Sequence, residues 1–207
     1  MAGEMLLCGM DEAGRGPFAG PLVAAAVIFP PTFVFAEAFP KLPLRDSKKL
    51  SMRQREALIE KIISAALTWK VEKITVAEIN ELGLGWANRA VFERLIGALE
   101  ADLYIVDGNL KLADVGEKRP KVRCVVRADE TDQTVSAASV IAKVTRDRIM
   151  HELHREYPQY GWIHNHGYGT PDHIAALRRY GATPHHRVQF VTTALSKPLP
   201  GMETIDQ

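Results

Sequence analysis

Three short apolar segments of this chain each run directly into an acidic residue, and this repetition constrains the fold more than any other feature. Brief β-branched runs that stop beside small residues are typical of buried strands. Segments with helical spacing lie between and after these runs, so we expect an α/β protein with helices packed on a mixed sheet. The acidic residues that follow the three runs are Asp11 and Glu12, Asp107, and Asp129.

Helix signals mark the segments around the predicted strands. Capping boxes begin at Ser51 and at Thr75, each with a Gln or Glu three residues later. A long helix is predicted from Ser136 to about Tyr157, where apolar residues recur among basic ones. A last helix is predicted to begin at Thr170-Pro171 and to end at Gly181.

The size of the chain favours one domain with an appended subdomain. Its 207 residues carry 26 Lys and Arg against 25 Asp and Glu, a formal net charge of +1. This balance excludes a purely electrostatic, histone-like binder of nucleic acid, although a local basic patch is compatible with it. The segment from about Ala194 has no periodicity and is predicted to be a loose tail.

Cysteine usage and hydropathy predict a cytoplasmic protein without a membrane span. Cys8 and Cys124 each sit in an apolar run, as buried thiols rather than a disulfide framework. The longest wholly apolar run, Leu22 to Phe29, is far shorter than the roughly 20 residues that span a bilayer. Without a coiled-coil pattern, a monomer is the expected state.

The strand-ending carboxylates predict a metal site. Clustered carboxylates repel one another, and burial raises their pKa, so they require compensating cations. Hard oxygen donors with little His or Cys nearby favour Mg²⁺ or Mn²⁺. Two such ions about 4 Å apart can hold a phosphodiester for in-line displacement, so phosphoryl transfer is the expected chemistry.

Two other interpretations compete with the metal site. Asp and Glu often close strands as ordinary turn residues, and only the joint pattern favours a site. Residues 14–19 also match the G-x-G-x-x-A fingerprint of nicotinamide-dependent enzymes, with Glu37 as the acidic partner. Asp11 and Glu12 would face the pyrophosphate there, and Pro21 opposes the helix that the fingerprint requires.

Several polar residues are candidates for contact with nucleic acid. Tyr168 lies on a loop before a helix, where its ring can stack on a sugar or base and its hydroxyl can bind a ribose 2′-OH. The histidines all fall between His151 and His186 without zinc spacing, and are predicted to be solvated or phosphate-facing. The basic candidates for phosphate contacts are Arg15, Lys48, Lys143, Arg146 and Arg187.

Five motifs occur in a fixed order along the chain: MDEAGRGP at 10–17, RDSKKLS at 45–51, VDG at 106–108, SAASVIAKVTRD at 136–147 and GYGT at 167–170. Together they resemble the bacterial ribonuclease HII family, over about residues 5 to 190. The resemblance implies a ribonuclease H-like fold with a helical C-terminal extension at about 158–193, a loose tail at about 194–207, and a single catalytic domain over 1–207.

The resemblance also implies an activity. The chain would cut 5′ of ribonucleotides in RNA/DNA hybrids and in duplex DNA, leaving 3′-OH and 5′-phosphate ends and serving ribonucleotide removal. Asp11, Glu12, Asp107 and Asp129 would bind two Mn²⁺ or Mg²⁺ ions. In substrate binding, Gly14, Arg15 and Gly16 would form a backbone cradle, and Tyr168 would sense the 2′-OH.

Two positions depart from the family pattern. Ala128 stands where Gly is usual, and His166 stands where Lys often precedes the Gly-Tyr motif. Ribonuclease HIII is the weaker match, because Asp11 lies too near the N-terminus for its extra domain. From another class, a non-catalytic nucleic-acid-binding module of the same fold is the alternative. The tail's contact with a replication partner is left open.

Overall fold

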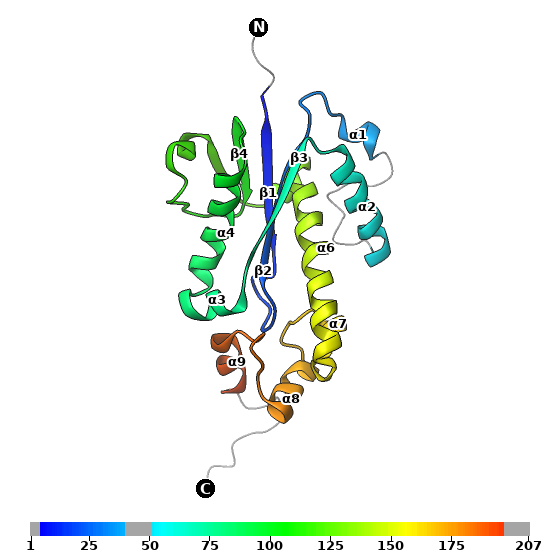
Figure 1. Ribbon diagram of the computed structural model, residues 1–207, viewed down its shortest axis with the longest axis vertical. Coiled ribbons are helices and arrows are strands. Elements are labelled where there is room, and N and C mark those ends of the chain that lie inside the picture. Colours follow the sequence, from blue (N-terminus) through cyan, green and yellow to red (C-terminus); the bar gives the residue numbers. More distant parts are fainter. Residues whose placement is uncertain (1–4, 40–50, 197–207) are drawn as a thin grey trace.

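A mixed sheet with helices on both faces forms the body of the protein. The computed structural model describes residues 5–39 and 51–196 (Figure 1). The strands are β1 Leu7–Ala13, β2 Leu22–Ile28, β3 Thr68–Ile74, β4 Leu103–Asp107 and β5 Val122–Val125. The helices are α1 Phe35–Ala38, α2 Met52–Ala65, α3 Val76–Leu82, α4 Leu84–Ala98, α5 Ala128–Thr131, α6 Gln133–Glu156, α7 Trp162–Asn165, α8 Pro171–Tyr180 and α9 Val188–Leu195, with 3₁₀ turns η2 Gly116–Lys121 and η3 Pro158–Tyr160.

The strand order is β3-β2-β1-β4-β5, with β1 in the centre. β1 pairs antiparallel with β2, and β2 with β3, whereas β4 and β5 continue parallel to β1. The predicted mixed α/β sheet is therefore confirmed. In the parallel pair, Met10 lies opposite Val106, so the residues that follow them, Asp11 and Asp107, come together at one end of the sheet.

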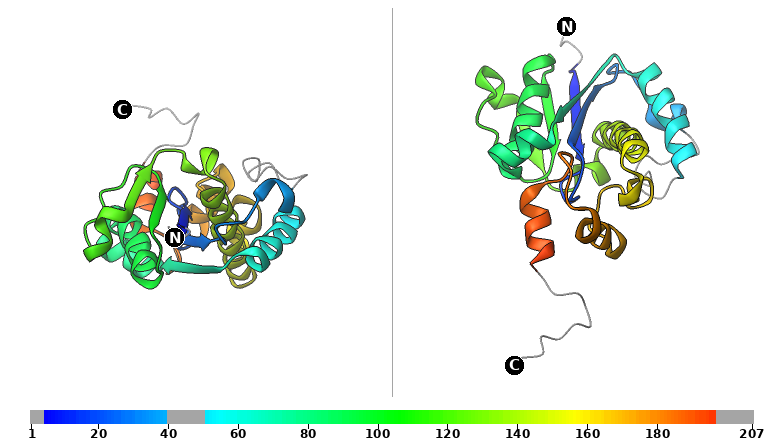
Figure 2. Two further views of the ribbon diagram at one scale, coloured as in Figure 1. Left: turned by 90° about the horizontal axis from the view of Figure 1, so that it is seen from above. Right: turned by 60° about the horizontal axis from the view of Figure 1, so that its bottom comes forward.

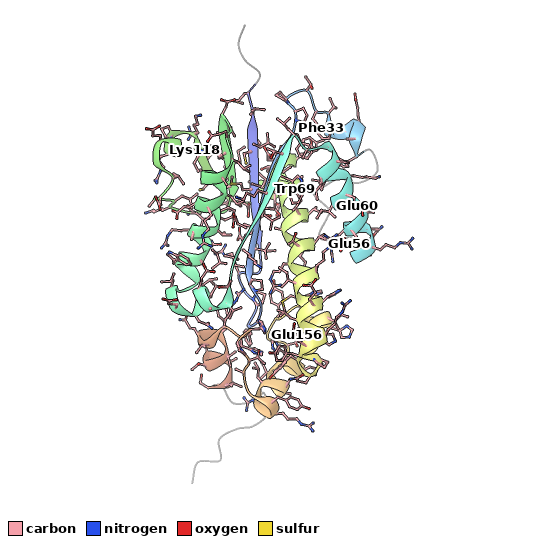
Figure 3. The ribbon with its side chains drawn as sticks, in the orientation of Figure 1. Phe33, Glu56, Glu60, Trp69, Lys118 and Glu156 are labelled. Atoms are coloured by element: carbon pink, nitrogen blue, oxygen red, sulfur yellow. The ribbon has the colours of Figure 1, made fainter. Side chains whose placement is uncertain are left out.

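Every residue of β2 is buried, because helices cover both faces of the sheet (Figure 2). Successive side chains point to opposite faces, so the strand contributes to two separate cores. Leu22 and Ile28 belong to the core that includes α4, and Val27 belongs to the core formed with α2 and α6. The stacked rings of Phe29 and Phe33 lie 4.6 Å apart in this second core, and Figure 3 labels Phe33.

Helix α6 crosses β1 at very close range. A Cβ at Gly9 would lie 2.5 Å from the backbone of Thr134 and Val135, a distance that real side chains do not adopt. Glycine at this position therefore allows the first turn of α6 to rest on the strand. This close approach places the first turn of α6 beside β1, just before Asp11 and Glu12 in the strand.

The C-terminal helices pack as a small unit at the end of the sheet where the chain turns from β1 into β2 (Figure 1). Its core includes Met150, Trp162 and Leu177. It is tied to the turn between β1 and β2 by backbone hydrogen bonds, including one of 2.7 Å from the Phe18 amide to the Gly167 carbonyl. The expected helical extension is thus present, and it contacts the turn that carries the Gly14–Gly16 segment.

Most helix starts lie where the sequence predicts them. The capping boxes at Ser51 and Thr75 both form, and α8 follows Thr170. The long helix begins three residues earlier than predicted, because the Asp132 side chain accepts hydrogen bonds from two amides of its first turn. The tail was predicted to begin at Ala194, which instead lies within α9, and residues 197–207 lie outside the description.

Both cysteines are free thiols, with Cys8 buried and Cys124 partly exposed. In the described ranges, no helix combines the length and the apolar character required to cross a membrane.

Candidate active site

The four predicted acidic residues converge at one end of the sheet. Asp11 and Glu12 lie inside β1, which continues to Ala13, so the prediction that the first strand stops before them is wrong. Asp107 is the last residue of β4, and Asp129 lies on the short helix α5 after β5 rather than directly at a strand end. The charges of Glu12, Asp107 and Asp129 all act on Asp11, which shows that the four residues form one electrostatic cluster.

Burial and mutual repulsion destabilise the charged forms of two carboxylates. Asp11 is only 7% exposed, and desolvation followed by the charges of Glu12 and Asp107 raises its pKa to about 8. Desolvation also raises the pKa of Glu12 to about 7, although Arg15, 3.5 Å away, opposes the shift. The Glu12 Oε2 atom is buried without a hydrogen-bond partner in the described structure. Such a cluster requires a cation.

The donor chemistry fits divalent metal ions that are completed by other ligands. Among residues 5–39 and 51–196, no three His, Cys, Asp or Glu side chains are gathered tightly enough to hold an ion unaided. Mg²⁺ commonly uses one or two carboxylates, several waters and substrate phosphate oxygens. A bound divalent cation would give the buried Glu12 oxygen a partner. It would also offset the repulsion that raises the pKa of Asp11, so the residues present fit such an ion.

Asp107 is oriented by the segment that carries Asp129. The Ala128 amide donates a hydrogen bond of 2.7 Å to Asp107 Oδ1, and Arg127 before it adopts a left-handed backbone conformation. The Ala128 methyl group is itself buried. Alanine at position 128 is therefore compatible with this backbone hydrogen bond, which links Asp107 to the segment that carries Asp129.

An open cavity of about 360 Å³ lies beside Asp11 and Glu12. Asp107 and Asp129 do not line it, so the cavity covers only one side of the acidic cluster. Besides the end of β1, it brings together four separate segments of the chain: the turn after β1, α2, one face of α6 and the Tyr168 loop. Its other lining residues are Ala13, Gly14, Arg15, Gly16, Arg55, Ser139, Val140, Lys143, Arg146 and Tyr168.

Arg187 supports the turn after β1 from the buried side of that turn. Its guanidinium donates hydrogen bonds to the carbonyls of Gly14 (2.6 Å), Arg15 (2.9 Å) and Gly20. The side chain is 1% exposed, so the prediction that Arg187 contacts phosphate from the surface is wrong. By fixing two carbonyls on the buried side, Arg187 sets the backbone orientation of the Gly14–Gly16 segment.

Arg146 has a similar buried position, which corrects its predicted role. It is 1% exposed, and its guanidinium donates to the carbonyls of Ala19, Pro21 and His166. A Cβ at Gly14, where φ is +99°, would overlap this guanidinium. Arg146 therefore supports the floor of the cavity, and its donors are used by backbone oxygens rather than being available to phosphate.

The Tyr168 loop rests on two buried histidines. His173 Nδ1 lies 2.8 Å from the Tyr168 carbonyl, and its Nε2 lies 3.1 Å from both Trp162 Nε1 and His186 Nε2. Because the Thr183 amide donates to His186 Nδ1, His186 carries its proton on Nε2 and donates to His173. His173 then donates to Tyr168, so both rings are neutral.

These contacts correct, for His173 and His186, the prediction that the histidines are solvated or face phosphate, whereas His164 is exposed. Burial lowers the pKa of His173, and burial together with the charge of His173 lowers the pKa of His186 to about 4. The Tyr168 side chain itself remains exposed at the cavity mouth.

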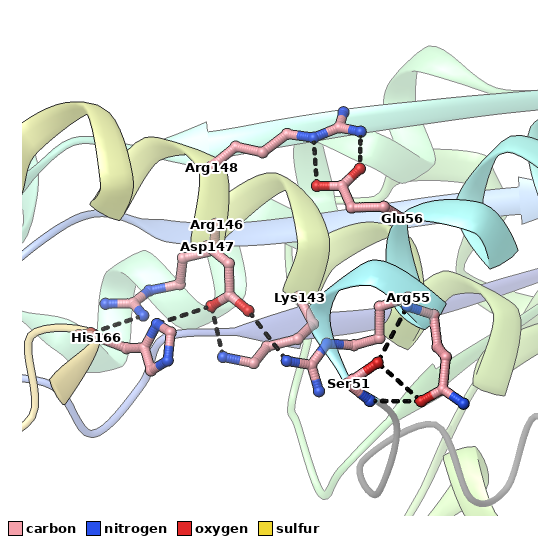
Figure 4. A network of polar contacts seen from close by, with 9 residues as sticks. Ser51, Arg55, Glu56, Lys143, Arg146, Asp147, Arg148 and His166 are labelled. Atoms are coloured by element: carbon pink, nitrogen blue, oxygen red, sulfur yellow. Dashed lines mark hydrogen bonds and ion pairs between the residues drawn. The ribbon is translucent and has the colours of Figure 1, made fainter. Parts of the chain in front are cut away.

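Lys143 belongs to a network centred on a buried carboxylate (Figure 4). Asp147 accepts a 2.6 Å hydrogen bond from Lys143, and it also lies within 3.7 Å of Arg55 and 3.4 Å of His166. Arg55 and Lys143 both line the cavity. Lys48 lies outside the described residues, so its predicted phosphate contact stays a prediction.

Comparison with known proteins identifies the family. The sequence model of ribonuclease HII matches residues 8–193. The chain belongs to the ribonuclease HII family. It is 44% identical over 190 residues to the ribonuclease HII of Ralstonia nicotianae, covering 89% of this chain and 76% of that protein. It is thus a type 2 ribonuclease H, a hydrolase.

Solved structures support the same fold. The ribonuclease H2 of Pyrococcus horikoshii OT3 has a TM-score of 0.76 and 29% identity, covering 93% of this chain and 98% of that one. A ribonuclease HIII solved in complex with Mn²⁺ has a TM-score of 0.68, with 94% of this chain and 70% of that chain covered. At 20% identity, this second similarity shows the fold alone.

The sequence did not predict the buried residues that hold the side chains and loops of the site in position. Neither Arg55 nor Asp147 was a candidate, although Lys143 and Asp147 have the i, i+4 spacing of a helical ion pair. The orientations of His173 and Arg187 carried no such local signal, since their partners lie on other segments.

Proposed function

We propose that the chain cleaves the strand 5′ of ribonucleotides, in RNA/DNA hybrids and at single ribonucleotides within duplex DNA. The products would carry 3′-OH and 5′-phosphate ends. The observation that carries this proposal is the cavity that joins Asp11 and Glu12 to the Gly14–Gly16 segment and Tyr168. Carboxylates for phosphodiester hydrolysis and an exposed aromatic hydroxyl for a sugar thereby share one surface.

Asp11, Glu12, Asp107 and Asp129 would hold two Mg²⁺ or Mn²⁺ ions. When bound, the ions supply positive charge for the phosphodiester, an activated water and stabilisation of the leaving oxygen. Asp11 would be the central ligand of the four, because the charges of Glu12, Asp107 and Asp129 all act on it. Asp129 would serve the water side, and Glu12 with Asp107 the leaving-group side.

The remaining residues would recognise the ribonucleotide. Because the buried Arg187 guanidinium donates to the carbonyls of Gly14 and Arg15, the backbone amides of the Gly14–Gly16 cradle are held in one orientation. The Tyr168 ring would stack on the next sugar, and its hydroxyl would read the 2′-OH. Lys143 would contact a phosphate near the Asp147 network.

The test is cleavage of an end-labelled DNA duplex that carries one ribonucleotide, with Mg²⁺ or Mn²⁺. We expect one metal-dependent cut 5′ of the ribonucleotide, with Asp11→Asn and Asp129→Asn reducing the rate by at least about 100-fold. Glu130→Gln is the matched control, because Glu130 is exposed beside Asp129. Normal cleavage by Asp129→Asn would refute the carboxylate site.

The substrate specificity is tested with Tyr168 variants on the same duplex. Tyr168→Ala is expected to lose both rate and preference for the ribonucleotide junction, whereas Tyr168→Phe isolates the hydroxyl. Unchanged cleavage by Tyr168→Ala would refute its role. Binding of the duplex without cleavage in either metal would instead favour a non-catalytic module of the same fold.

A further inference from the structure

A second cavity, which we call the α4 cavity, shares the lining residue Arg15 with the cavity beside Asp11 and Glu12. Its volume is about 500 Å³. It is formed where the first two turns of α4 meet the loop that follows Asp107. The residues that line it are Arg15, Leu84, Gly85, Asn88, Arg89, Asn109, Leu110 and Lys111.

The lining of the α4 cavity is cationic. Arg15, Arg89 and Lys111 contribute three positive charges, and the lining includes no acidic residue. Within the described ranges, neither Arg89 nor Lys111 forms an ion pair, and both are exposed. The first turn of α4 adds the positive end of a 15-residue helix dipole. The combination favours an anion.

Asn88 provides an independent sign of a ligand. This cavity-lining residue is only 4% exposed, and its Oδ1 atom is buried without a hydrogen-bond partner in the described structure. A buried polar atom without a partner costs about 1–3 kcal/mol, so native proteins rarely retain one without a reason. A sugar hydroxyl, a base amino group or a ligand-bound water can donate to it.

Arg15 connects the two cavities. Its side chain is 58% exposed and lines both of them, while Asn109 lies only two residues beyond Asp107. A nucleic acid held at the acidic cluster would therefore reach the α4 cavity without leaving the protein surface. Repeating phosphates along a backbone match two neighbouring anion sites better than an isolated small anion does.

We propose that the α4 cavity binds a backbone phosphate of the nucleic acid, away from the bond that is cut. This inference rests on the proposed function and extends it with a second contact point. Arg89 and Lys111 would hold the phosphate, and Asn88 would accept a hydrogen bond from the attached nucleotide or its water. The phosphate belongs either to the cleaved strand or to the opposite strand.

The first experiment measures binding without cleavage, by fluorescence anisotropy in Ca²⁺ with the ribonucleotide-containing duplex. Arg89→Ala combined with Lys111→Ala is expected to raise Kd by about 10-fold, and to reduce the slope of log Kd against log salt by about one. In the cleavage assay, KM should rise with little change in kcat. Lys61→Ala on α2 is the control, an exposed cation on the opposite face of the sheet.

The second experiment identifies the strand. Single phosphates are replaced by neutral methylphosphonates, position by position, in one strand and then the other. At the contacted position, the wild type should lose affinity and the double variant should lose nothing further. The strand that contains this position is the source of the phosphate, and no such position in either strand would overturn the proposal.

The two proposals can fail separately. A wild-type protein that neither binds nor cleaves the duplex would contradict the proposed function. A wild-type protein that cleaves normally, beside a double variant with unchanged Kd and salt dependence, would overturn only the α4 cavity.

Discussion

His173 donates a hydrogen bond of 2.8 Å from Nδ1 to the backbone carbonyl of Tyr168. The histidine is fully buried and the tyrosine side chain is exposed, so the bond connects the interior of the C-terminal unit to the mouth of the cavity. His173 is thereby a positioning residue for the Tyr168 loop, acting through the backbone rather than touching the substrate.

Removing this hydrogen-bond donor should lower the catalytic efficiency. His173→Leu is expected to reduce kcat/KM by about 10-fold, because one buried hydrogen bond of about 1–3 kcal/mol is lost. His173→Asn offers an amide N–H near the position of Nδ1 and should recover part of the loss. The comparison is made with single-ribonucleotide duplexes at a temperature where both variants are folded. Equal activity of His173→Leu and wild type would contradict the positioning role.

Neutralising Asp11 should stabilise the metal-free protein. The pKa of Asp11 is raised to about 8 from 3.8, so the native state takes up a proton that the unfolded state lacks, and stability falls as pH rises between these values. At pH 8 in EDTA, Asp11→Asn is expected to raise Tm by a few degrees, about 1–2 kcal/mol of stability. Added Mg²⁺ or Mn²⁺ should raise the Tm of wild type more than that of the variant. A lower Tm for the variant in EDTA would show that the carboxylate is not destabilising.

Replacing Arg187 by lysine should destabilise the protein. Arg187→Lys retains the charge but cannot reach the carbonyls of Gly14, Arg15 and Gly20 together, so we expect a loss of about 3 kcal/mol in the free energy of unfolding. Urea denaturation measures it. Arg155→Lys is the control, since Arg155 is exposed on α6. Equal stability of the two variants would show that the buried hydrogen bonds contribute little.

The buried histidines should make the protein sensitive to acid. The pKa of His186 is lowered to about 4 from 6.5, and that of His173 is also lowered, so the unfolded state binds protons first as pH falls. Their stabilisation is present above about pH 6.5 and is lost toward pH 4. Asp11 and Glu12 act in the opposite direction over this range, because their native pKa values are raised.

The histidine contribution is therefore measured in the variant Asp11→Asn with Glu12→Gln. We expect its free energy of unfolding to fall by about 1–2 kcal/mol per pH unit between pH 6.5 and 5, with a shallower dependence in wild type. Urea titrations at several pH values provide the comparison. A pH-independent stability in the variant would contradict the neutral histidine pair.

The sequence predicted the parts of the fold that local patterns encode. Apolar runs located β1, β4 and β5, and capping boxes located α2 and α3, because these signals depend on neighbours within one or two turns. The expected gathering of Asp11 and Asp107 at one edge of the sheet is observed, because β1 and β4 pair in parallel with Met10 opposite Val106. Their role as metal ligands stays a prediction.

The inward-facing cations could not be predicted in the same way. A charged residue is ordinarily expected at the surface, and Arg146 and Arg187 were assigned there. Their partners are backbone carbonyls, which every residue has and which leave no trace in the side-chain pattern. The bond from Arg187 to Gly14 joins residues 173 positions apart, so only the completed fold reveals it.

That separation has a consequence for the order in which the protein is made. A ribosome adding about 5–20 residues per second needs roughly 10–35 s to travel from Gly14 to Arg187. During that interval the strand carrying Asp11 and Glu12 exists without the guanidinium that holds the adjoining turn. The nascent chain thus acquires Asp11 and Glu12 well before the side chain that fixes the adjoining cradle, so the site cannot be fully assembled until Arg187 has been added.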